Sequence, residues 1–470
     1  MTPDPASQAV RRPRIAVVLA AGKGTRMKSE RPKVLHEAGG RPLLAWVVAA
    51  ARAAGCERIL VVVGHGADDV RDAFAGQPDL VWIEQREQRG TGHALLQAER
   101  EIAAPALLLV LSGDVPLVRA ETLAELAAAA ERSWGAMAVA TLERPGALGR
   151  VVSDGRDGLR AIVEARDASP DELALPTVNA GLYALPAPEI GAFLERLRPD
   201  NAQDELYLTD AVTAAARAAG RVELVALDDA NEALGVNDRL ELARVHRLLV
   251  TRKIHALALG GATFLDPAAT TVDADVTVGR DSIVHAAVSL LGAARIGERV
   301  TVHAGAWIRD SEIADDATIE PYSVLDRARV GAGCRVGPFA RLRPAAVLEA
   351  GARVGNFVEV KNSTLGPGAK ANHLAYLGDA TVGAGANIGA GVVTCNYDGV
   401  AKHATEVGAR AFIGSDTMLV APVRIGEDAV TGAGSVVTKD VPAGALAVER
   451  GEQRTVPGWT ARRRQRRGKD

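Results

Sequence analysis

The sequence predicts an α/β domain with a mostly parallel sheet, followed by a parallel β-helix. Over residues 15–237, strands that are apolar on both faces alternate with amphipathic helices, which is typical of parallel sheets with helices on both sides. From residue 263, aliphatic side chains recur at steps of five or six residues, and the pattern itself repeats every 17 or 18 residues. Three short strands per coil, each with one inward aliphatic side chain, describe a triangular solenoid.

Bulk composition excludes several classes of protein. The 470 residues are enough for several domains with cores of their own. The 55 Lys and Arg residues nearly balance the 58 Asp and Glu residues, so no strong field attracts nucleic acid. No apolar run reaches the roughly 18 residues that a membrane span needs. Three cysteines without CxxC spacing (Cys56, Cys334, Cys395) favour a reducing compartment. We therefore expect a cytoplasmic protein with no nucleic-acid partner and no membrane insertion.

Both ends of the chain differ from the domains. Residues 1–14 are polar, contain proline and lack the apolar core of a signal peptide, so we expect a disordered extension. Residues 451–470 form a basic tail with a run of arginines from Arg462 to Arg467. Such a run is either a solvated tail or an arm that contacts phosphates.

Within the first domain, the ends of the strands predict where a ligand binds. The expected strands cover residues 15–19, 59–63 and 107–111, and the expected first helix covers 42–54. This arrangement is Rossmann-like, and ligands of open parallel sheets bind at the carboxyl ends of the strands. The glycine-rich residues 20–24 and Asp114 each follow a strand, so we expect both at that edge of the sheet.

The second half begins with a linker and continues as the solenoid. A helix is expected from Asn237 to Leu259, with Asn237 or Asp238 as its N-cap, and it defines a linker over residues 238–262. The solenoid is expected over residues 263–450. Inward positions in successive coils are expected at Ile296, Ile313, Val330, Val347, Leu365 and Val382. The repeat breaks over residues 394–405, and a solenoid can expel such a segment as a loop that carries function.

The segment from Leu19 to Met27 has the chemistry of phosphate binding. Gly22 and Gly24 allow backbone N–H groups to approach a phosphate chain, and Arg26 and Lys33 add positive charge. The segment is not a Walker A loop, because GKS or GKT is absent at the required spacing.

With GxGTRM followed by Pro32-Lys33, the chain resembles the sugar-1-phosphate nucleotidyltransferase family. Further segments of that family occur in the expected order: Gln88–Ala94, Ser112–Pro116, Asn179–Gly181 and Gly235–Asp238. The resemblance implies that a sugar phosphate attacks the α-phosphorus of a nucleoside triphosphate and that pyrophosphate leaves. Alignment and charge neutralisation dominate such a reaction.

The resemblance also implies roles for residues of the first domain. Asp114 and Asn237 would hold Mg²⁺, and Arg26 and Lys33 would be catalytic, offsetting charge on the α-phosphate and on pyrophosphate. The substrate-binding residues would be Ala20, Ala21, Gly22, Lys33, Gln85, Gly90 and Thr91 for the nucleotide, and Gly149, Glu164, Asn179 and Asn237 for the sugar. Gln85 would read the uracil edge, but it could bond thymine equally well, so UTP over dTTP rests on the resemblance.

Three features of the solenoid point beyond a structural role. His373 and Tyr376 lie together in AKANHLAYLGD, and Lys402 lies in the segment that interrupts the repeat. The run Gly432–Pro442 resembles the closing coils of hexapeptide-repeat acyltransferases, which bind acetyl-CoA in the groove between neighbouring solenoids. This resemblance implies a left-handed β-helix and a homotrimer.

Both halves in this order resemble the family of bifunctional bacterial enzymes that make UDP-N-acetylglucosamine, over roughly residues 15–450. The second domain would transfer the acetyl group of acetyl-CoA to glucosamine-1-phosphate. The first would then transfer uridylyl from UTP to N-acetylglucosamine-1-phosphate. The product would feed the precursors of peptidoglycan and lipopolysaccharide.

Acetyl transfer needs a neutral amine, and a histidine suits the removal of a proton near neutral pH. By the family's motif, His373 is that base. Arg343, Lys361, Tyr376, Asn387 and Lys402 would bind the sugar phosphate. Ala390, Asn396, Tyr397, Ser415, Ala433 and Arg450 would bind acetyl-CoA. Asn396 and Tyr397 would also orient the base or polarise the thioester.

Three other interpretations stay open. The first is a single-function sugar-1-phosphate nucleotidyltransferase whose β-helix is structural or regulatory. The second is a trimeric scaffold with a degenerate nucleotide pocket, against which the set of Lys33, Asp114 and Asn237 argues. The third is a metal site between solenoids, like that of carbonic anhydrases.

Overall fold

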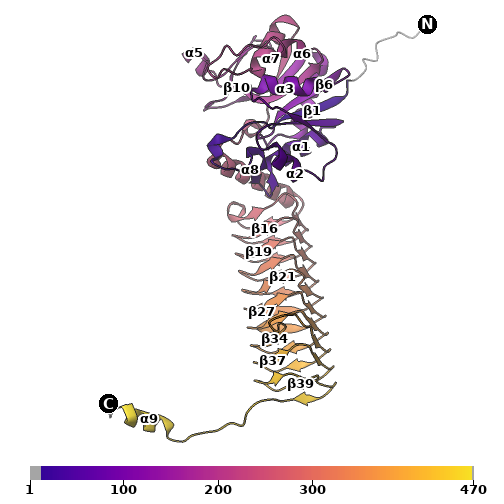
Figure 1. Ribbon diagram of the computed structural model, residues 1–470, viewed down its shortest axis with the longest axis vertical. Helices are drawn as coiled ribbons and strands as arrows, with labels where there is room; N and C mark the ends of the chain where they lie inside the picture. Colours follow the sequence, from indigo (N-terminus) through magenta and orange to yellow (C-terminus); the bar gives the residue numbers. More distant parts are fainter. Residues whose placement is uncertain (1–11, 468–470) are drawn as a thin grey trace, which may run out of the picture. The chain divides into compact units, whose positions relative to one another are not determined.

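The computed structural model of this protein describes residues 12–467. Most of the extension predicted over residues 1–14 therefore lies outside the described residues. The chain divides into two compact units, Met1–Leu249 and Val250–Asp470, and helix α8 (Arg239–Leu259) runs from the first into the second. Figure 1 shows the helices and strands of both units.

The first unit is built on a mixed, mostly parallel sheet. Its main row has the order β11-β7-β10-β6-β1-β4-β5, and the hairpin of β8 (Arg150–Ser153) and β9 (Leu159–Val163) branches from β10. The strands of the row are β1 (Arg14–Leu19), β4 (Arg58–Val63), β5 (Leu80–Glu84), β6 (Ala106–Ser112), β7 (Gly135–Thr141), β10 (Thr177–Ala187) and β11 (Val222–Ala226). Within this row β10 is antiparallel to both neighbours, and all other neighbours are parallel.

Helices cover both faces of this sheet. They are α1 (Leu43–Ala53) and α4 (Ala120–Arg132) on one face, and α3 (Thr91–Glu99) and α7 (Leu208–Ala218) on the other. Ala16 and Val18 point to the first face, and Ile15 and Val17 point to the second. Successive side chains of β1 therefore enter two separate cores, which is why this strand is apolar on both faces.

The carboxyl ends of β1 and β6 lie side by side because the two strands pair in parallel, with Leu19 opposite Ser112. The segments that follow them also meet, since the Gly113 N–H donates to the Leu19 carbonyl at 2.9 Å. The glycine-rich loop and Asp114 therefore share one edge of the sheet, as the sequence predicts.

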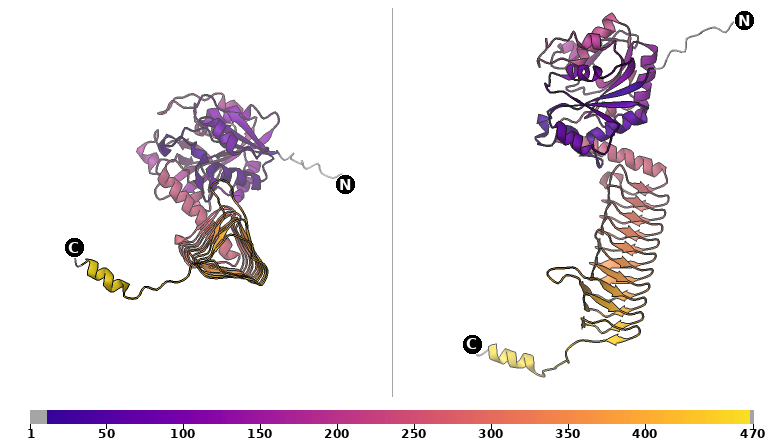
Figure 2. Two further views of the ribbon diagram at one scale, coloured as in Figure 1. Left: turned by 60° about the horizontal axis from the view of Figure 1, so that its bottom comes forward. Right: turned by 45° about the vertical axis from the view of Figure 1, so that its right-hand side comes forward.

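The second unit is a parallel β-helix with a triangular cross-section (Figure 2). Its strands stack into three sheets of 11, 10 and 9 strands, which form its three faces. Face 1 runs from β12 (Thr263–Phe264) to β41 (Leu446–Ala447), face 2 from β13 (Thr271–Val272) to β40 (Val436–Val437), and face 3 from β14 (Thr277–Val278) to β38 (Val423–Ile425). These long parallel stacks are consistent with the left-handed β-helix that the resemblance implies.

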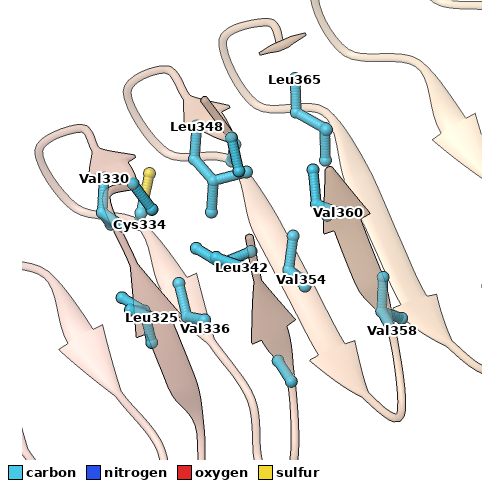
Figure 3. Close-up of a cluster of buried hydrophobic side chains, with 14 of the residues drawn as sticks. Leu325, Val330, Cys334, Val336, Leu342, Leu348, Val354, Val358, Val360 and Leu365 are labelled. Carbon is cyan, nitrogen blue, oxygen red and sulfur yellow. The ribbon is translucent and has the colours of Figure 1, made fainter. Parts of the chain in front are cut away.

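Aliphatic side chains fill the interior of the solenoid (Figure 3). The predicted inward positions Ile296, Ile313 and Val330 are buried. The prediction for Val347 is wrong, because Leu348 faces inward instead and pairs with Val330. The buried positions show that the coil after Val330 takes three steps of six residues, whereas the coil before it ends with a step of five.

The predicted interruption of the repeat is present as a loop. Strands β34 (Val393–Cys395) and β35 (Thr405–Val407) bound a segment that projects from the solenoid (Figure 2). The stacking continues across it, because β34 pairs with β37 (Met418–Val420) and β35 pairs with β38 in parallel register. Thr394 takes the inward position of β34, and its hydroxyl donates to the Gly378 carbonyl at 3.0 Å.

The linker and the tail each contain a helix. Of the two predicted caps, Asp238 begins α8, since its carboxylate accepts hydrogen bonds from the N–H groups of Leu240 and Glu241, each at 2.9 Å. The basic tail contains helix α9 (Trp459–Arg467), which the sequence analysis does not predict.

Leu325 and Val324 are neighbours in β22 (Val324–Asp326), but only Leu325 points into the solenoid. We expect Leu325→Ala to lower the free energy of unfolding of the second unit by about 2–5 kcal/mol, because it leaves a cavity in the core. Val324→Ala, on the outer surface, should cost about 1 kcal/mol or less. Guanidinium unfolding followed by circular dichroism measures both, and equal losses would contradict this assignment of the inward side.

Candidate active sites

A cleft of about 510 Å³ opens at the edge of the sheet in the first unit. It is lined by every residue predicted for the nucleotide, its phosphates and the metal: Ala20, Ala21, Gly22, Arg26, Lys33, Gln85, Gly90, Thr91, Asp114 and Asn237. Glu205, to which the sequence analysis assigns no role, lines it as well. A concave site of this size suits a nucleotide.

The glycine-rich loop presents free donors to this cleft. Among the described residues, the N–H groups of Gly22, Lys23 and Gly24 donate to no other protein group. Gly24 has φ 59°, and a Cβ there would lie 2.8 Å from the Cβ of Lys33. This position therefore requires glycine, and the loop can offer its amides to a phosphate group.

Lys33 bridges two oxygen atoms across the cleft. Its ammonium donates to Asp114 Oδ2 and lies 3.4 Å from Asn237 Oδ1. The backbone holds the two oxygen-bearing segments together, because the Val236 N–H donates to the Asp114 carbonyl at 2.9 Å. The carboxylate and amide oxygens that surround the Lys33 ammonium are also suitable ligands for Mg²⁺, which takes its other ligands from substrate phosphates and water. Within residues 12–467, no cluster of three or more His, Cys, Asp or Glu side chains could hold a metal ion.

A second cleft of about 780 Å³ adjoins the first and shares Arg26, Ser112 and Asn237 with it. The residues predicted for the sugar line this second cleft: Gly149, Glu164, Asn179 and Asn237. Arg26 is exposed where the clefts meet and forms no ion pair with any described residue. Two phosphate-bearing ligands in the two clefts would therefore meet at an unpaired guanidinium.

A β-bulge positions Asn179. Strand β10 shifts its register against β7 between Asn179 and Tyr183, and Gly181 between them has φ 70°. Asn179 Oδ1 accepts from the Gly181 N–H at 2.9 Å, and its Nδ2 donates to the Tyr183 hydroxyl at 2.7 Å. Bulges often re-aim a side chain beside an active site, and this one holds the Asn179 amide in a fixed orientation.

Glu164 is a carboxylate in a largely buried environment. Burial raises its pKa, and the nearby Asp210 and Asp167 act in the same direction. The Thr209 hydroxyl opposes this shift by donating a hydrogen bond to Oε1 at 3.1 Å. The ionised form of Glu164 therefore lowers the stability of the folded state. Such perturbed groups are common at functional sites.

The structure also shows the contacts of Arg150, which follows Gly149 in a segment similar to the family's sugar-binding positions. Its buried guanidinium donates to the carbonyls of Leu148, Gly146 and Leu173. It therefore holds the loop that ends at Gly149 against the second cleft.

In the second unit, His373 lies at the corner between faces 1 and 2. It ends β30 (Lys370–His373) and pairs with Asn356 at the end of β27 (Arg353–Asn356). Its Nδ1 lies 2.7 Å from Asn356 Oδ1, which can only accept, so Nδ1 carries the proton and Nε2 keeps its lone pair. Asn356 is not among the predicted site residues, although it lies one 17-residue coil before His373.

Three of the residues predicted for acetyl-CoA form a column with His373 along the same corner. Each lies two residues beyond a paired position of face 1, and the column comprises His373, Ala390, Ser415 and Ala433. Arg450 closes this column by donating to the Ala433 carbonyl at 3.0 Å. The small side chains leave the backbone accessible along its length.

Cations and carboxylates gather at a second corner of the solenoid, where face 2 meets face 3. Arg343 donates to Glu359 at 2.9 Å, and Lys361 lies 3.8 Å from Asp379. Burial favours a raised pKa for Asp379, but hydrogen bonds from Asn362 and Asn396 and the charges of Lys361 and Lys402 outweigh it and lower the pKa. The Lys361 ammonium in turn lowers the pKa of Lys402. Tyr376 lies on face 2 between the two corners, in β31 (Tyr376–Gly378).

Three other predicted residues, Asn387, Asn396 and Tyr397, lie apart from the groups to which the resemblance assigns them, when a single chain is considered. Asn387 lies on face 1, in β33 (Asn387–Ile388), away from Lys361. Asn396 bonds Asp379, and the Tyr397 hydroxyl donates to the Gly399 carbonyl at 2.7 Å. Neither bonds His373 within the described chain, where the partner of the ring is Asn356.

Comparison with known proteins first defines the class. Residues 16–179 match the model of the MobA-like NTP transferase domain. The glycine-rich loop, the first cleft and Asp114 all fall within or beside this stretch, so the first unit contains a nucleotidyltransferase domain. A solved structure of UDP-glucose pyrophosphorylase complexed with UDP-glucose aligns over 51% of this chain and 99% of that chain, with 18% identity and a TM-score of 0.42, too low to establish a shared fold.

Relatives over the whole length then define the family. The "Bifunctional protein GlmU" of Stutzerimonas stutzeri is 47% identical over 94% of this chain and 98% of that protein. The proteins of the same name from Acidithiobacillus ferrooxidans and Chromobacterium violaceum are each 46% identical, over 95% and 94% of this chain and 98% and 97% of their own lengths. This chain belongs to that family of bifunctional proteins.

Over residues 12–467, no helix is both long enough and apolar enough to cross a bilayer.

The raised pKa of Glu164 has a consequence for stability. The folded state binds its proton more tightly than the unfolded state, so at neutral pH the ionised group destabilises the first unit. We expect Glu164→Gln to raise the thermal midpoint of this unit at pH 7. The gain should shrink as the pH falls through the raised pKa, where the wild-type carboxyl becomes neutral. Calorimetry at several pH values measures this, and a lower midpoint for the variant at pH 7 would contradict it.

Proposed function

We propose that this chain catalyses two consecutive reactions of UDP-N-acetylglucosamine synthesis. The second unit transfers an acetyl group from acetyl-CoA to the amine of glucosamine-1-phosphate. The first unit transfers uridylyl from UTP to N-acetylglucosamine-1-phosphate and releases pyrophosphate. The observation that carries the proposal is the presence of two chemically distinct sites in a chain of this family: the oxygen pair around the Lys33 ammonium and the preoriented ring of His373.

In the first unit, the two clefts would hold the two substrates. The phosphates of UTP would bind the free N–H groups of residues 22–24, and the sugar phosphate would approach Arg26 from the second cleft. A sugar-phosphate oxygen forms the bond to the α-phosphorus as the bond to pyrophosphate breaks. Since no proton transfer to the protein is required, Arg26 and Lys33 contribute by stabilising charge.

We assign Mg²⁺ to Asp114 and Asn237. When bound, the ion offsets phosphate charge and orients the phosphate oxygens. The two side chains supply oxygen ligands, and the Lys33 ammonium, which bridges them in the free chain, turns to the phosphates.

In the second unit, His373 would act as the general base. Its Nε2 accepts a proton from the substrate amine, while Nδ1 stays bonded to Asn356. The amine nitrogen forms the bond to the thioester carbonyl carbon, the carbon–sulfur bond breaks, and CoA leaves as the thiol after taking up a proton. Arg343, Lys361 and Lys402 would bind the phosphate of the sugar, and the column ending at Arg450 would bind acetyl-CoA.

An exposed row of apolar side chains supports the homotrimer. Tyr322, Phe339 and Phe357 occupy the corner between faces 1 and 2 in successive coils, and their rings stack at 5.4 and 5.5 Å. Their exposed fractions are 57%, 49% and 57%, and Leu374, next to His373, continues the row at 60%. Exposed apolar patches mark association surfaces. We propose that a neighbouring chain covers this row and supplies its Asn387 to the site.

We also propose limits for the domains and a location for the protein. The nucleotidyltransferase would cover residues 15–237, the linker 238–262, the acetyltransferase 263–450 and the basic tail 451–470. The division of the chain within α8 supports the two catalytic parts. A cytoplasmic location is supported by Cys56, Cys334 and Cys395, all of which carry free thiols.

Two substitutions should separate the two activities. Asp114→Ala removes an oxygen ligand beside the phosphates and should lower pyrophosphate release from UTP by about 100-fold or more. His373→Ala should lower CoA release with glucosamine-1-phosphate by about 10²–10⁴-fold, because the amine loses its general base. Each variant should keep the activity of the other unit.

The retained activity serves as the folding control for each variant. Full CoA release by His373→Ala would contradict the assigned base. A wild-type protein that releases pyrophosphate but never CoA would favour a nucleotidyltransferase with a structural β-helix.

The exposed row can be tested by sedimentation. Phe339→Asp places a charge in the centre of the row and should convert the trimer to a monomer, with loss of CoA release and retention of pyrophosphate release. Leu240→Asp, at an exposed position of the first unit, is the matched control and should remain trimeric. A fully active monomeric wild type would exclude the proposed shared site.

A further inference from the structure

The amide of Gln85 is held by two neighbours within the first cleft. Gln85 follows β5, is 3% exposed, and its backbone N–H donates to the Val63 carbonyl at 2.8 Å. Its Nε2 donates to the Gly90 carbonyl at 3.1 Å and lies 3.0 Å from His93 Nδ1. An amide nitrogen has two hydrogens, so this pair of acceptors uses both.

This arrangement fixes which atom of the amide faces the cleft. The Gly90 carbonyl can only accept, so the amide nitrogen must point toward it. The oxygen, Oε1, then lies on the other side, and no described residue donates a hydrogen bond to it. Since Gln85 lines the cleft, its amide presents an acceptor of fixed direction to a bound base.

The second bond requires one particular form of His93. Its Nδ1 must be unprotonated to accept from Gln85, so the ring proton sits on Nε2. That nitrogen lies 3.2 Å from Gln97 Nε2, so the exchangeable Gln97 amide must turn its oxygen to the ring to accept this proton. Burial, followed by the charge of Arg89, lowers the pKa of His93, while the Glu87 carbonyl and carboxylate oppose this shift. A neutral ring is therefore the form that this position favours.

We infer that His93 is a positioning residue that makes the first cleft select uracil over cytosine. At the N3 position uracil offers an N–H donor, which the fixed Gln85 oxygen can accept. Cytosine offers a lone pair at the same position, which that oxygen repels. His93 does not need to touch the base, because it acts through the orientation of the Gln85 amide. The inference rests on the proposed uridylyl transfer and adds the basis of its base selectivity.

Loss of the histidine acceptor should relax this selection. One N–H of Gln85 would then be buried without a partner. Only the Gly90 carbonyl would still oppose rotation of the amide, so the free-energy gap between its two orientations would narrow. The rotated amide would offer an N–H toward the base, where cytosine N3 could accept it. Selectivity would fall without loss of any group proposed to touch the phosphates or the sugar.

The test compares His93→Phe with His93→Asn. Phenylalanine fills the space of the ring without an acceptor, whereas the asparagine oxygen can take the place of Nδ1. We expect the ratio of kcat/KM for UTP to that for CTP to fall at least about tenfold in His93→Phe, and to be largely retained in His93→Asn. CoA release by the second unit should be unchanged in both variants, which shows that neither substitution acts on the second unit.

The affinities for UTP and CTP, measured by calorimetry, test the same preference without turnover. A lower UTP preference in His93→Phe, with recovery in His93→Asn, supports the inference even if the sugar acceptor proves to be different. An unchanged binding ratio in His93→Phe overturns it, and so does an equal loss for both nucleotides. Absence of pyrophosphate release from UTP in the wild type would instead contradict the proposed reaction.

Discussion

Backbone hydrogen bonds between parallel strands hold the functional residues of both units in place. In the first unit, the pairing of β1 with β6 brings the glycine-rich loop next to Asp114, although almost a hundred residues of sequence separate them. In the second unit, parallel stacking aligns residues one coil apart, as with Asn356 and His373. Side chains at these positions need little further support, because the register of the strands already determines their neighbours.

Charge compensation is the second principle that the two sites share. The Lys33 ammonium is balanced by Asp114, and Lys361 is balanced by Asp379. Each site therefore keeps its cations ordered without leaving them unpaired in a partly buried environment, which would be costly. In the proposed reactions, an arriving phosphate would have to compete with an internal carboxylate, which would favour ligands with strong and well-placed negative charge at both sites. Arg26, unpaired among the described residues, differs in being available from the start.

The fold could be predicted from the sequence because its periods are long and regular. Uninterrupted apolar strands led to the parallel sheet, and the five- and six-residue steps led to the solenoid. Val347 shows where this prediction fails. Whether a step has five or six residues depends on the conformation of the corner, and the apolar pattern gives little information about that conformation. Site residues near strand ends, such as Asp114, were accessible for the same topological reason. The backbone contacts of Arg150 and the bond of His93 to Gln85 were not, since they depend on side-chain directions that no local sequence rule gives.

The column from His373 to Ala433 also defines the distance between the base and the far end of the proposed acetyl-CoA site. It follows strands β30, β33, β36 (Phe412–Ile413) and β39 (Val430–Thr431), which are consecutive in one sheet. Neighbouring strands are about 4.8 Å apart, so the column is about 14 Å long. An acyl donor that is anchored at Ala433 and reacts at His373 must span that distance with a narrow, extended arm. In the proposed reaction, the β-helix would therefore set the length of the acyl donor, and a compact donor such as an acyl phosphate could reach the base but not the anchor.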